Sequence, residues 1–236
     1  MMNAETTCDE AGMAGNIVVA AELLERHYGR RDDMRPFGEW LTLVRVVLER
    51  GRSTKGRHDW SWLAESPLRG PGETALLTAS RLQEIVGAAG LKASQAKVLP
   101  ALAEWWLQNF DDDACADFGT RPLESWHREL RAVRGVNWKL ADRILLAVGG
   151  LAVYPLDRGS LRIAARHGWM DMSAEYDEWQ AFFVGGLRGS GVGVGDLSDW
   201  NSRVGHEFCG AEPQCETCPL QGLLPEKGPI PLRSEE

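Results

Sequence analysis

Apolar residues recur at helical spacing along most of this 236-residue chain. They fall three or four positions apart, with charged residues on the opposite side of each turn. The spacing predicts helices over 17–28, 36–50, 78–88, 94–110, 123–133, 138–148, 174–184 and 200–208, and another that begins near Ser160. No stretch alternates apolar and polar residues for long enough to predict a sheet. The expected fold class is therefore all-α.

Three segments lack this pattern. Residues 1–14 are small and turn-forming, and we expect them to be a flexible N-terminal arm. Residues 185–198 hold six glycines and are expected to form a loop. Residues 223–236 hold three prolines and a charged end, which predicts a disordered tail.

Composition limits the class of protein further. With 44% hydrophobic residues, the chain can bury an ordinary globular core, as one large domain or two small ones. Its longest apolar stretches are far shorter than the roughly 20 residues that cross a bilayer, and its N-terminus is acidic, unlike a signal peptide. We therefore expect a monomeric, cytoplasmic protein with no membrane partner. The net charge of −8 speaks against a uniformly basic surface but leaves room for a local basic face.

Residues 133–141, with the sequence VRGVNWKLA, predict a tight turn that opens a helix. Gly135 readily takes left-handed backbone angles, and Asn137 is of a residue type that tolerates them. The backbone N–H groups of such a turn, together with the positive end of the next helix, bind a phosphate oxygen without reading base sequence. The alternative is a hairpin that serves packing alone.

Lys139 and Asp157 are the candidate chemical groups near this turn. Lys139 lies one residue inside the helix start, where the positive helix end and an apolar wall favour a neutral, nucleophilic amine. Asp157 follows 18 residues later, where it can cap the helix that begins near Ser160 and stay ionised. Taken singly, the alternatives are a surface lysine and a plain helix cap.

Together these features resemble the helix-hairpin-helix (HhH-GPD) DNA glycosylase superfamily, and within it the endonuclease III family. That family's pattern is L-P-G-V-G-x-K-T-A, followed after an apolar helix and a loop by V-D-T-H-V-x-R. In this chain VRGVNWKLA and LDRGSLR stand at these places, and the resemblance extends from Pro36 to Pro219. It places the family's catalytic lysine on Lys139 and its catalytic aspartate on Asp157.

The resemblance implies two helical subdomains with a DNA-binding cleft between them. One would comprise residues 36–153 with the hairpin, and the other residues 15–35 plus 154–222 with a C-terminal cysteine cluster. The damaged nucleotide would be flipped out of the duplex, and Lys139 would attack its sugar and expel the base. The resulting Schiff base would lead to β-elimination, so the expected partner is double-stranded DNA with damaged bases or abasic sites. The residues expected to hold this DNA are Gly135, Val136, Asn137, Arg134, Arg158, Arg50 and Arg52.

Three departures from the family pattern fall on the predicted site. Asn137 replaces the second hairpin glycine and adds a side chain that would face the phosphate. Arg158 and Gly159 replace a Thr-His pair, so a long cation lies beside the candidate aspartate. The family carries a glutamine that fills the gap left by the flipped base, where this chain reads ERGRST from residue 49. Arg50 or Arg52 would fill that gap instead.

Charge and tryptophan placement are compatible with a DNA-binding face. Residues 121–166 hold nine basic and four acidic residues, a local charge of 9 − 4 = +5, and residues 45–57 hold a second basic group. The alternative is a set of solvated helix faces. Most of the ten tryptophans are expected in the core, whereas Trp60, Trp62 and Trp138 are candidates for stacking on bases.

Cys209, Cys215 and Cys218 form a cluster with five and then two intervening residues. In a reducing compartment such a cluster favours a metal site over disulfides. The family's four-cysteine motif holds a [4Fe–4S] cluster, but no cysteine follows Cys218, although the fourth would be expected near Leu223 or Leu224.

Several ligand sets remain open for this cluster. A [4Fe–4S] cluster could take His206, Cys8 or an exogenous ligand as its fourth ligand. Zinc held by His206 and the three cysteines is the second possibility. The third is a remnant site without metal.

The sequence thus predicts a base-excision repair DNA glycosylase with associated AP lyase activity. One alternative is a monofunctional glycosylase for an alkylated or mispaired base, in which Asp157 acts with water. The other is a non-catalytic helix-hairpin-helix DNA-binding protein.

Overall fold

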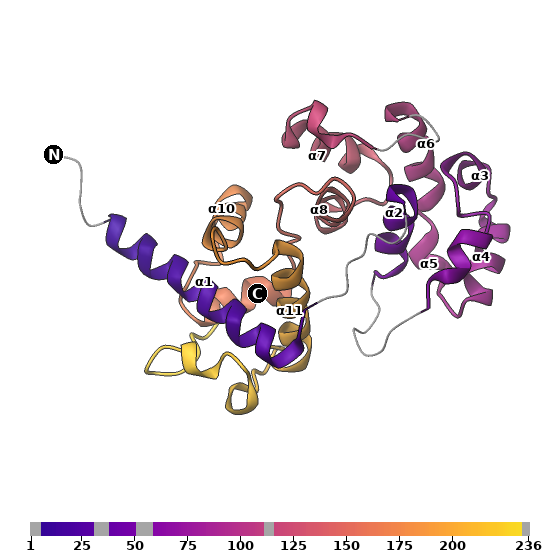
Figure 1. Cartoon of the computed structure of the whole chain (residues 1–236). Coiled ribbons are helices and arrows are strands. Elements are labelled where there is room, and N and C mark those ends of the chain that lie inside the picture. The colour runs from indigo at the N-terminus through magenta and orange to yellow at the C-terminus, as the bar shows by residue number, and fades with distance from the viewer. Residues whose placement is uncertain (1–5, 31–37, 51–58, 111–115, 233–236) are drawn as a thin grey trace. The chain divides into compact units, whose positions relative to one another are not determined.

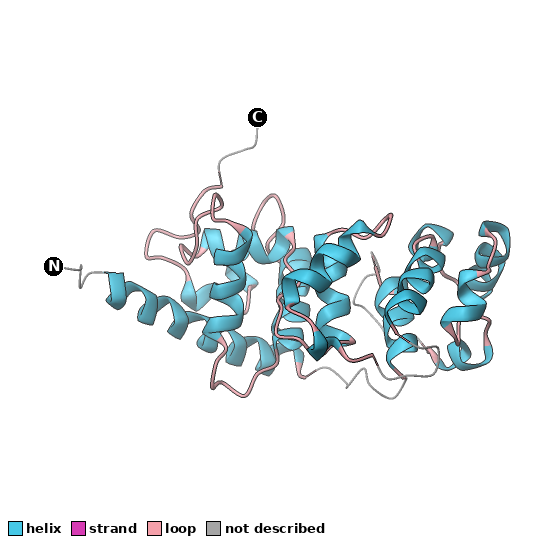
Figure 2. Ribbon diagram, turned by 90° about the horizontal axis from the view of Figure 1, so that it is seen from above, coloured by secondary structure: helices cyan, strands magenta, loops and turns pink. Residues whose placement is uncertain are grey.

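The structure of the chain is a computed structural model that describes residues 6–30, 38–50, 59–110 and 116–232. Within these ranges all regular elements are helices, and the sole β-contact is an isolated bridge between Cys209 and Pro213 (Figure 2). The predicted all-α fold class is confirmed. No helix in the described ranges is both long and apolar enough to span a membrane.

The chain divides into two compact units, whose segments can be followed in Figure 1 by the colour that marks residue number. The first unit combines residues Met1–Asp32 with Ala152–Glu236, and the second comprises Asp33–Leu151. Elements of the first unit are α1 (Thr6–Tyr28), α9 (Arg158–Arg166), α10 (Tyr176–Gly186), α11 (Val194–Glu207) and the 3-10 turns η3 (Cys215–Thr217) and η4 (Gln221–Leu223). Those of the second are α2 (Glu39–Leu48), η1 (Ser61–Glu65), α3 (Pro71–Ala75), α4 (Ala79–Ala88), α5 (Ala93–Ala96), α6 (Leu99–Asn109), η2 (Phe118–Thr120), α7 (Leu123–Ala132) and α8 (Trp138–Ala147).

The second unit packs around apolar helix faces and an aromatic cluster. Helix α8 packs on α2 and α7, and α6 packs on α3. The ring of Phe110 stacks on that of Trp126 at a centroid distance of 5.4 Å, and Phe118 lies against both. Trp126 also donates its indole N–H to the Phe118 carbonyl, so the buried indole is satisfied. This core fixes the ends of α7 and α8, between which the hairpin lies.

The first unit packs α1 on α10 and α11, and α9 on α11. Its core includes the stacked rings of Tyr154 and Phe183, with centroids 4.0 Å apart. Trp200 on α11 is buried and donates its indole N–H to the carbonyl of Gly29, just after α1. The start of α9, which carries Asp157 as its cap, is therefore held against α11 by a closed apolar core.

Several predicted element boundaries were wrong. Helix α1 begins at Thr6, inside the predicted flexible arm, because its first turns are built from small residues that give no apolar period. Residues 94–110 form two helices rather than one, since Pro100 lies in the first turn of α6 and cannot continue a preceding helix. Helix α11 begins at Val194, inside the predicted glycine loop, because Gly193 serves as its N-cap residue and Leu197 is fully buried.

The predicted disordered tail, residues 223–236, lies within the described residues as far as 232. The backbone N–H of Ile230 donates to the Arg166 carbonyl at 2.9 Å, which ties this segment to the end of α9. The three prolines of this segment disfavour a helix, but they are compatible with an ordered, extended backbone.

Candidate functional site

The hairpin between α7 and α8 has the geometry that the sequence predicted at Gly135. This glycine has φ of +92°, a region that residues with a side chain rarely adopt. The Val136 N–H donates to the Val133 carbonyl and closes the turn, while the Val136 side chain is buried. Gly135 itself is exposed, so the turn presents its backbone to solvent.

Asn137 plays a different role from the one predicted. Its φ is −98°, so it is not a second left-handed residue. Its side-chain Oδ1 instead accepts the Leu140 N–H at 3.0 Å and caps α8. The Asn137 side chain therefore already accepts a hydrogen bond from one of the N–H groups in the first turn of α8.

Arg50 anchors the hairpin to the end of α2. Its guanidinium donates to the carbonyls of Gly135 and Gln95, each at 3.3 Å, and burial lowers its pKa. The Gln95 amide in turn donates to the carbonyls of Leu48 and Arg50 at 2.8 and 2.7 Å. Arg50 is thus engaged with backbone carbonyls, and Arg52 lies outside the described residues.

Lys139 occupies the first turn of α8 and is half-buried. Its neighbour Trp138 is 42% exposed, with its ring 4.3 Å from that of His127 and 3.8 Å from the Arg131 guanidinium carbon. His127 Nε2 lies 2.9 Å from Oδ1 of Asp142, whose side chain is fully buried. This buried pair was not predicted from the sequence, although an acidic residue, Asp142, lies among the buried residues of α8.

Asp157 is the N-cap of α9, as predicted, and both of its carboxylate oxygens accept hydrogen bonds. Oδ1 accepts the N–H of Ser160 at 2.8 Å and its hydroxyl at 2.9 Å. Oδ2 accepts the hydroxyl of Ser202, on α11, at 2.6 Å. Hydrogen bonds of this kind favour the ionised carboxylate and fix its orientation.

A buried network of hydrogen bonds continues from this carboxylate through Ser160. The Tyr154 hydroxyl lies 2.9 Å from the Ser160 hydroxyl and accepts the Asn201 amide at 2.9 Å. Burial raises the pKa of Tyr154 well above its ordinary value, so the phenol stays protonated and can donate. The network links α9 and α11 to the segment before Asp157.

Gly159 has a packing role that explains why no side chain stands at this position. Gly159 on α9 lies directly against Gly205 on α11. A Cβ added to Gly205 would be only 2.6 Å from the Cα of Gly159. A histidine at position 159 would force α9 and α11 apart. Arg158, beside it, is exposed.

The basic residues of 121–166 divide into engaged and exposed sets. Arg121 pairs with Glu129, Arg143 pairs with Glu49, and Arg162 donates to the carbonyls of Cys209 and Gly205. Arg128, Arg131 and Arg134 around the hairpin are exposed, although Arg128 donates to the Ser125 hydroxyl at 3.4 Å and Arg131 stacks on Trp138. The local basic face is therefore smaller than the net charge of the segment indicates.

Of the tryptophans proposed for base stacking, Trp60 is buried, with 6% of its surface exposed. It belongs to the core, so that prediction was wrong for this residue. Trp62 is half-buried, and Trp138 is the exposed member of the three.

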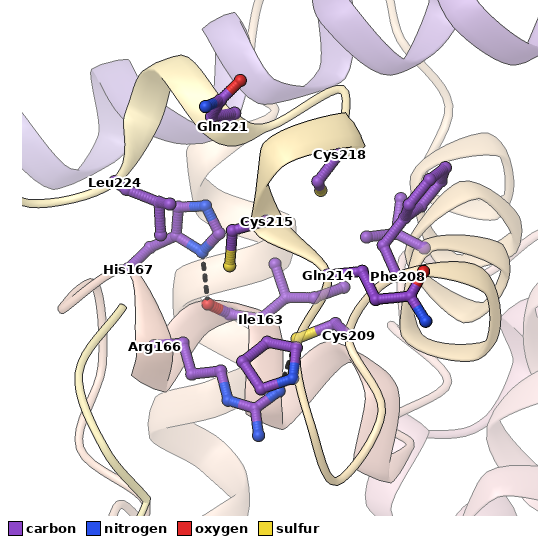
Figure 3. Close-up of a pocket in the computed structure, with 12 residues that line it drawn as sticks. Ile163, Arg166, His167, Phe208, Cys209, Gln214, Cys215, Cys218, Gln221 and Leu224 are labelled. Atoms are coloured by element: carbon purple, nitrogen blue, oxygen red, sulfur yellow. Dashed lines mark hydrogen bonds between the residues drawn. The ribbon is translucent and has the colours of Figure 1, made fainter. Parts of the chain in front are cut away.

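Cys209, Cys215 and Cys218 line one pocket at the end of α11, together with Arg166 and His167 from α9 and its C-terminus (Figure 3). The pocket is small and partly open to solvent. All three cysteines are free thiols, and burial raises the pKa of Cys218. Within the described ranges, no three His, Cys, Asp or Glu side chains converge closely enough to surround a single metal ion.

His206, the predicted fourth ligand, is exposed in the last turn of α11 and is absent from the residues that line this pocket. The side chain of Cys8 lies outside the described residues. The histidine that does line the pocket is His167, whose Nδ1 lies 2.7 Å from the Ile163 carbonyl and whose Nε2 lies 3.3 Å from the Leu220 carbonyl. Burial lowers the pKa of this imidazole.

Comparison with solved structures identifies proteins with a similar fold. A thermostable thymine-DNA glycosylase superposes with a TM-score of 0.60 at 15% identity, over 92% of this chain and 96% of that one. Endonuclease III in a non-covalent complex with DNA gives 0.54 at 17% identity, over 88% and 93%. Endonuclease III in a trapped covalent intermediate with DNA gives 0.53 at 17% identity, over 86% and 91%.

The chain therefore has the all-α fold of the helix-hairpin-helix DNA glycosylases. Within that class it is similar over most of its length to thymine-DNA glycosylase and to endonuclease III, which confirms the resemblance at the level of the fold. No family model matches the sequence, and no curated protein matches it either.

Proposed function

We propose that this protein is a base-excision repair DNA glycosylase with associated AP lyase activity. The observation that carries the proposal is Lys139 in the first turn of the helix that the Gly135 hairpin opens, on a glycosylase fold. Endonuclease III, with the same fold, forms a covalent intermediate with DNA that has been trapped. A nucleophilic lysine at the corresponding motif position of this chain supports the same chemistry.

In the proposed reaction, the Nζ of Lys139 attacks C1′ of a nucleotide flipped from the duplex. The bond between C1′ and the base breaks, and the base leaves with the electron pair and takes up a proton. The amine then loses one proton, the bond between C1′ and O4′ breaks as O4′ takes up a proton, and a protonated Schiff base with the opened sugar remains. Loss of a proton from C2′ eliminates the 3′ phosphate and nicks the strand.

Asp157 stabilises the positive charge that develops on the sugar as the base leaves. Its two carboxylate oxygens already hold three hydrogen bonds from Ser160 and Ser202, so the carboxylate needs little reorganisation as the charge forms. A preorganised anion of this kind typically lowers a barrier by several kcal/mol, on the order of a hundredfold or more in rate.

The hairpin binds the DNA backbone irrespective of the base sequence. The exposed Gly135 turn and the start of α8 offer N–H groups to a phosphate, and Arg134 adds an exposed cation beside them. Arg131, stacked on Trp138, extends the same exposed basic surface. Double-stranded DNA with a damaged base or an abasic site is the partner that fits this surface.

A monofunctional glycosylase is the second candidate. The similarity to a thymine-DNA glycosylase at a TM-score of 0.60 favours including thymine among the bases that are released. In that reaction Asp157 orients a water at C1′ and Lys139 forms no bond to the sugar.

Borohydride trapping separates the two candidates. Wild-type protein is mixed with duplexes that carry thymine glycol, an abasic site, an alkylated base or a G·T mispair, and borohydride is added during turnover. The proposal predicts a covalent protein–DNA adduct for wild type and for Lys227→Gln, a change at an exposed lysine outside the hairpin. It predicts no adduct for Lys139→Gln. Base release without any adduct would favour the monofunctional reaction, and neither base release nor adduct would favour a binding protein.

A further inference from the structure

Four polar side chains are buried together in the first unit, next to Asp157. Tyr154 and Ser160 are fully buried, and Ser198 and Asn201 are nearly so. They come from three places in the chain, namely the segment before α9, α9 itself and α11. Buried polar groups cost stability unless they are hydrogen-bonded, and apolar side chains would fill the same space without that cost. Their grouping beside the candidate aspartate therefore points to a role beyond packing.

Ser160 departs from the family pattern at its own position. It stands where V-D-T-H-V-x-R has its second valine, so a hydroxyl replaces an apolar side chain. That hydroxyl donates to Oδ1 of Asp157 at 2.9 Å, and the Ser160 N–H donates to the same oxygen at 2.8 Å. A valine could supply the N–H of this helix cap, but the second bond requires the hydroxyl. Because a carboxylate oxygen has two lone pairs, Ser160 alone fills the acceptor capacity of Oδ1.

The direction of the next hydrogen bond follows from counting protons. The Ser160 hydroxyl has one proton, and Asp157 takes it because an ionised carboxylate can only accept. In the 2.9 Å contact between the two hydroxyls, Ser160 is therefore the acceptor and Tyr154 the donor. Burial and the nearby Asp157 raise the pKa of Tyr154 well above its ordinary value, so the phenol keeps the proton that this bond needs.

The Tyr154 hydroxyl in turn accepts hydrogen bonds from α11. The Asn201 amide donates to it at 2.9 Å, and the side chain of Ser198 forms a further hydrogen bond with it. Since the phenol gives its own proton to Ser160, its oxygen can only accept these two bonds. The ring is held by Phe183, whose ring centroid lies 4.0 Å away in a stacked arrangement. Every donor along this chain therefore points toward the carboxylate.

We propose that Asn201, Tyr154 and Ser160 form a one-way chain of hydrogen bonds, each group donating to the next, that ends on Oδ1 of Asp157 and holds this carboxylate ionised and in one orientation. A hydroxyl that accepts one bond is polarised by it and donates the next bond more strongly. Ser160 and Tyr154 are thereby positioning residues for the anion that stabilises the sugar cation during base release. This role rests on the proposed function, whereas the direction of the chain does not.

Neutron diffraction from crystals of the DNA-free, deuterium-exchanged protein tests the direction of the chain. The expected map shows the Tyr154 deuteron directed at the Ser160 oxygen and the Ser160 deuteron directed at Oδ1 of Asp157. A Ser160 deuteron directed at Tyr154, or a deuteron bonded to the Asp157 carboxyl group, would overturn the proposal. This measurement needs neither a variant nor DNA, so it gives a result whether or not the protein releases bases.

A double-mutant cycle tests the positioning role. Single-turnover base release is measured at saturating protein for wild type, Ser160→Ala, Tyr154→Phe and the double variant. Ser160→Ala removes a hydrogen bond to a charged group and should lose roughly ten- to a hundredfold in rate, whereas Tyr154→Phe removes a neutral bond and should lose roughly two- to tenfold. The double variant should be as slow as Ser160→Ala alone, because Tyr154 acts through the Ser160 hydroxyl. Affinity for duplex DNA should stay at the wild-type value throughout.

Tyr28→Phe is the matched control. It removes another partly buried phenol hydroxyl of the first unit, which donates to Glu207 at 3.1 Å, and should leave the rate unchanged. Urea unfolding of each variant identifies a loss of rate that follows from a loss of fold.

Three kinetic results would overturn the positioning role. They are a wild-type rate in Tyr154→Phe, an undiminished further loss when Tyr154→Phe is added to Ser160→Ala, and weaker DNA binding at an unchanged rate. Absence of base release by wild type would instead overturn the proposed function, and the neutron map would still decide the direction of the chain.

Discussion

The hydroxyl of Ser202 donates a 2.6 Å hydrogen bond to Oδ2 of Asp157, across the contact between α11 and α9. The other oxygen, Oδ1, is already bound by Ser160 within α9. A helix cap alone needs only Oδ1, so the bond from α11 holds the carboxylate in one rotation. Ser202 is in this account a positioning residue for Asp157.

Replacing Ser202 with alanine should slow base release. Hydrogen bonds to a charged group contribute about 1.5–3 kcal/mol, which corresponds to roughly ten- to a hundredfold in rate if the bond is needed in the transition state. Single-turnover release of the damaged base measures this loss. Ser202→Thr keeps the hydroxyl and should restore most of the rate. The matched control is Ser173→Ala, which removes a similar 2.7 Å bond to Asp171 in the segment between α9 and α10 and should leave the rate unchanged.

Gly205→Ala should destabilise the first unit. The added Cβ would lie 2.6 Å from Gly159 Cα, and a backbone atom cannot move aside without shifting α9. Overpacking of this kind costs about 1–3 kcal/mol of the free energy of unfolding. Urea titration followed by tryptophan fluorescence measures it.

Gly185→Ala is the control for this substitution. Gly185 lies in α10 with nothing within 4 Å of its added Cβ, and alanine favours a helix over glycine by about 1 kcal/mol. Stability should stay equal or rise. If both variants lost the same stability, close contact between α9 and α11 would not be the cause.

Asn137 should matter as a helix cap rather than as a left-handed turn residue. Asn137→Ala leaves the Leu140 N–H without its partner and should cost about 1 kcal/mol, while Asn137→Gly should cost only a few tenths. Thermal or urea unfolding separates the two. Because glycine also frees an N–H at the start of α8, Asn137→Gly should bind duplex DNA at least as tightly as wild type. Weaker binding would show that the amide itself contacts the DNA.

Arg134→Gln should weaken binding to every duplex by a similar factor. Arg134 is exposed beside the hairpin, and loss of one phosphate contact reduces the slope of log affinity against log salt concentration by about 0.9. Fluorescence anisotropy over a range of salt concentrations measures that slope. Arg188→Gln, at an exposed arginine in the other unit, should leave it unchanged. A sequence-dependent effect at Arg134 would contradict a phosphate contact.

Local features of the site were predictable because their causes are local. The Asp157 cap lies three residues before the serine whose N–H it accepts, and the positive φ of Gly135 follows from glycine in a short turn. The helix boundaries at Thr6 and Val194 were not predictable in this way, since small residues and glycines carry no apolar period.

Contacts between residues far apart in the sequence could not be predicted from the spacing of apolar and polar residues. Ser202 reaches Asp157 from a helix far along the chain, and Gly159 is required by Gly205 rather than by its own turn. Spacing likewise favoured His206, three positions before Cys209, although packing leaves that histidine exposed and brings His167 to the pocket. Each of these relationships depends on how α9 crosses α11.

The most direct test of the central claim is the release of free base from duplex DNA by wild type and by Asp157→Asn under single-turnover conditions. The panel carries thymine glycol, an alkylated base and a G·T mispair, with undamaged duplex as the reference, and Ser173→Ala serves as the control variant. The account predicts release from at least one damaged duplex by wild type and by Ser173→Ala, and a loss of about a hundredfold or more in Asp157→Asn. Equal release by wild type and Asp157→Asn, or binding of every duplex without release of any base, would contradict it.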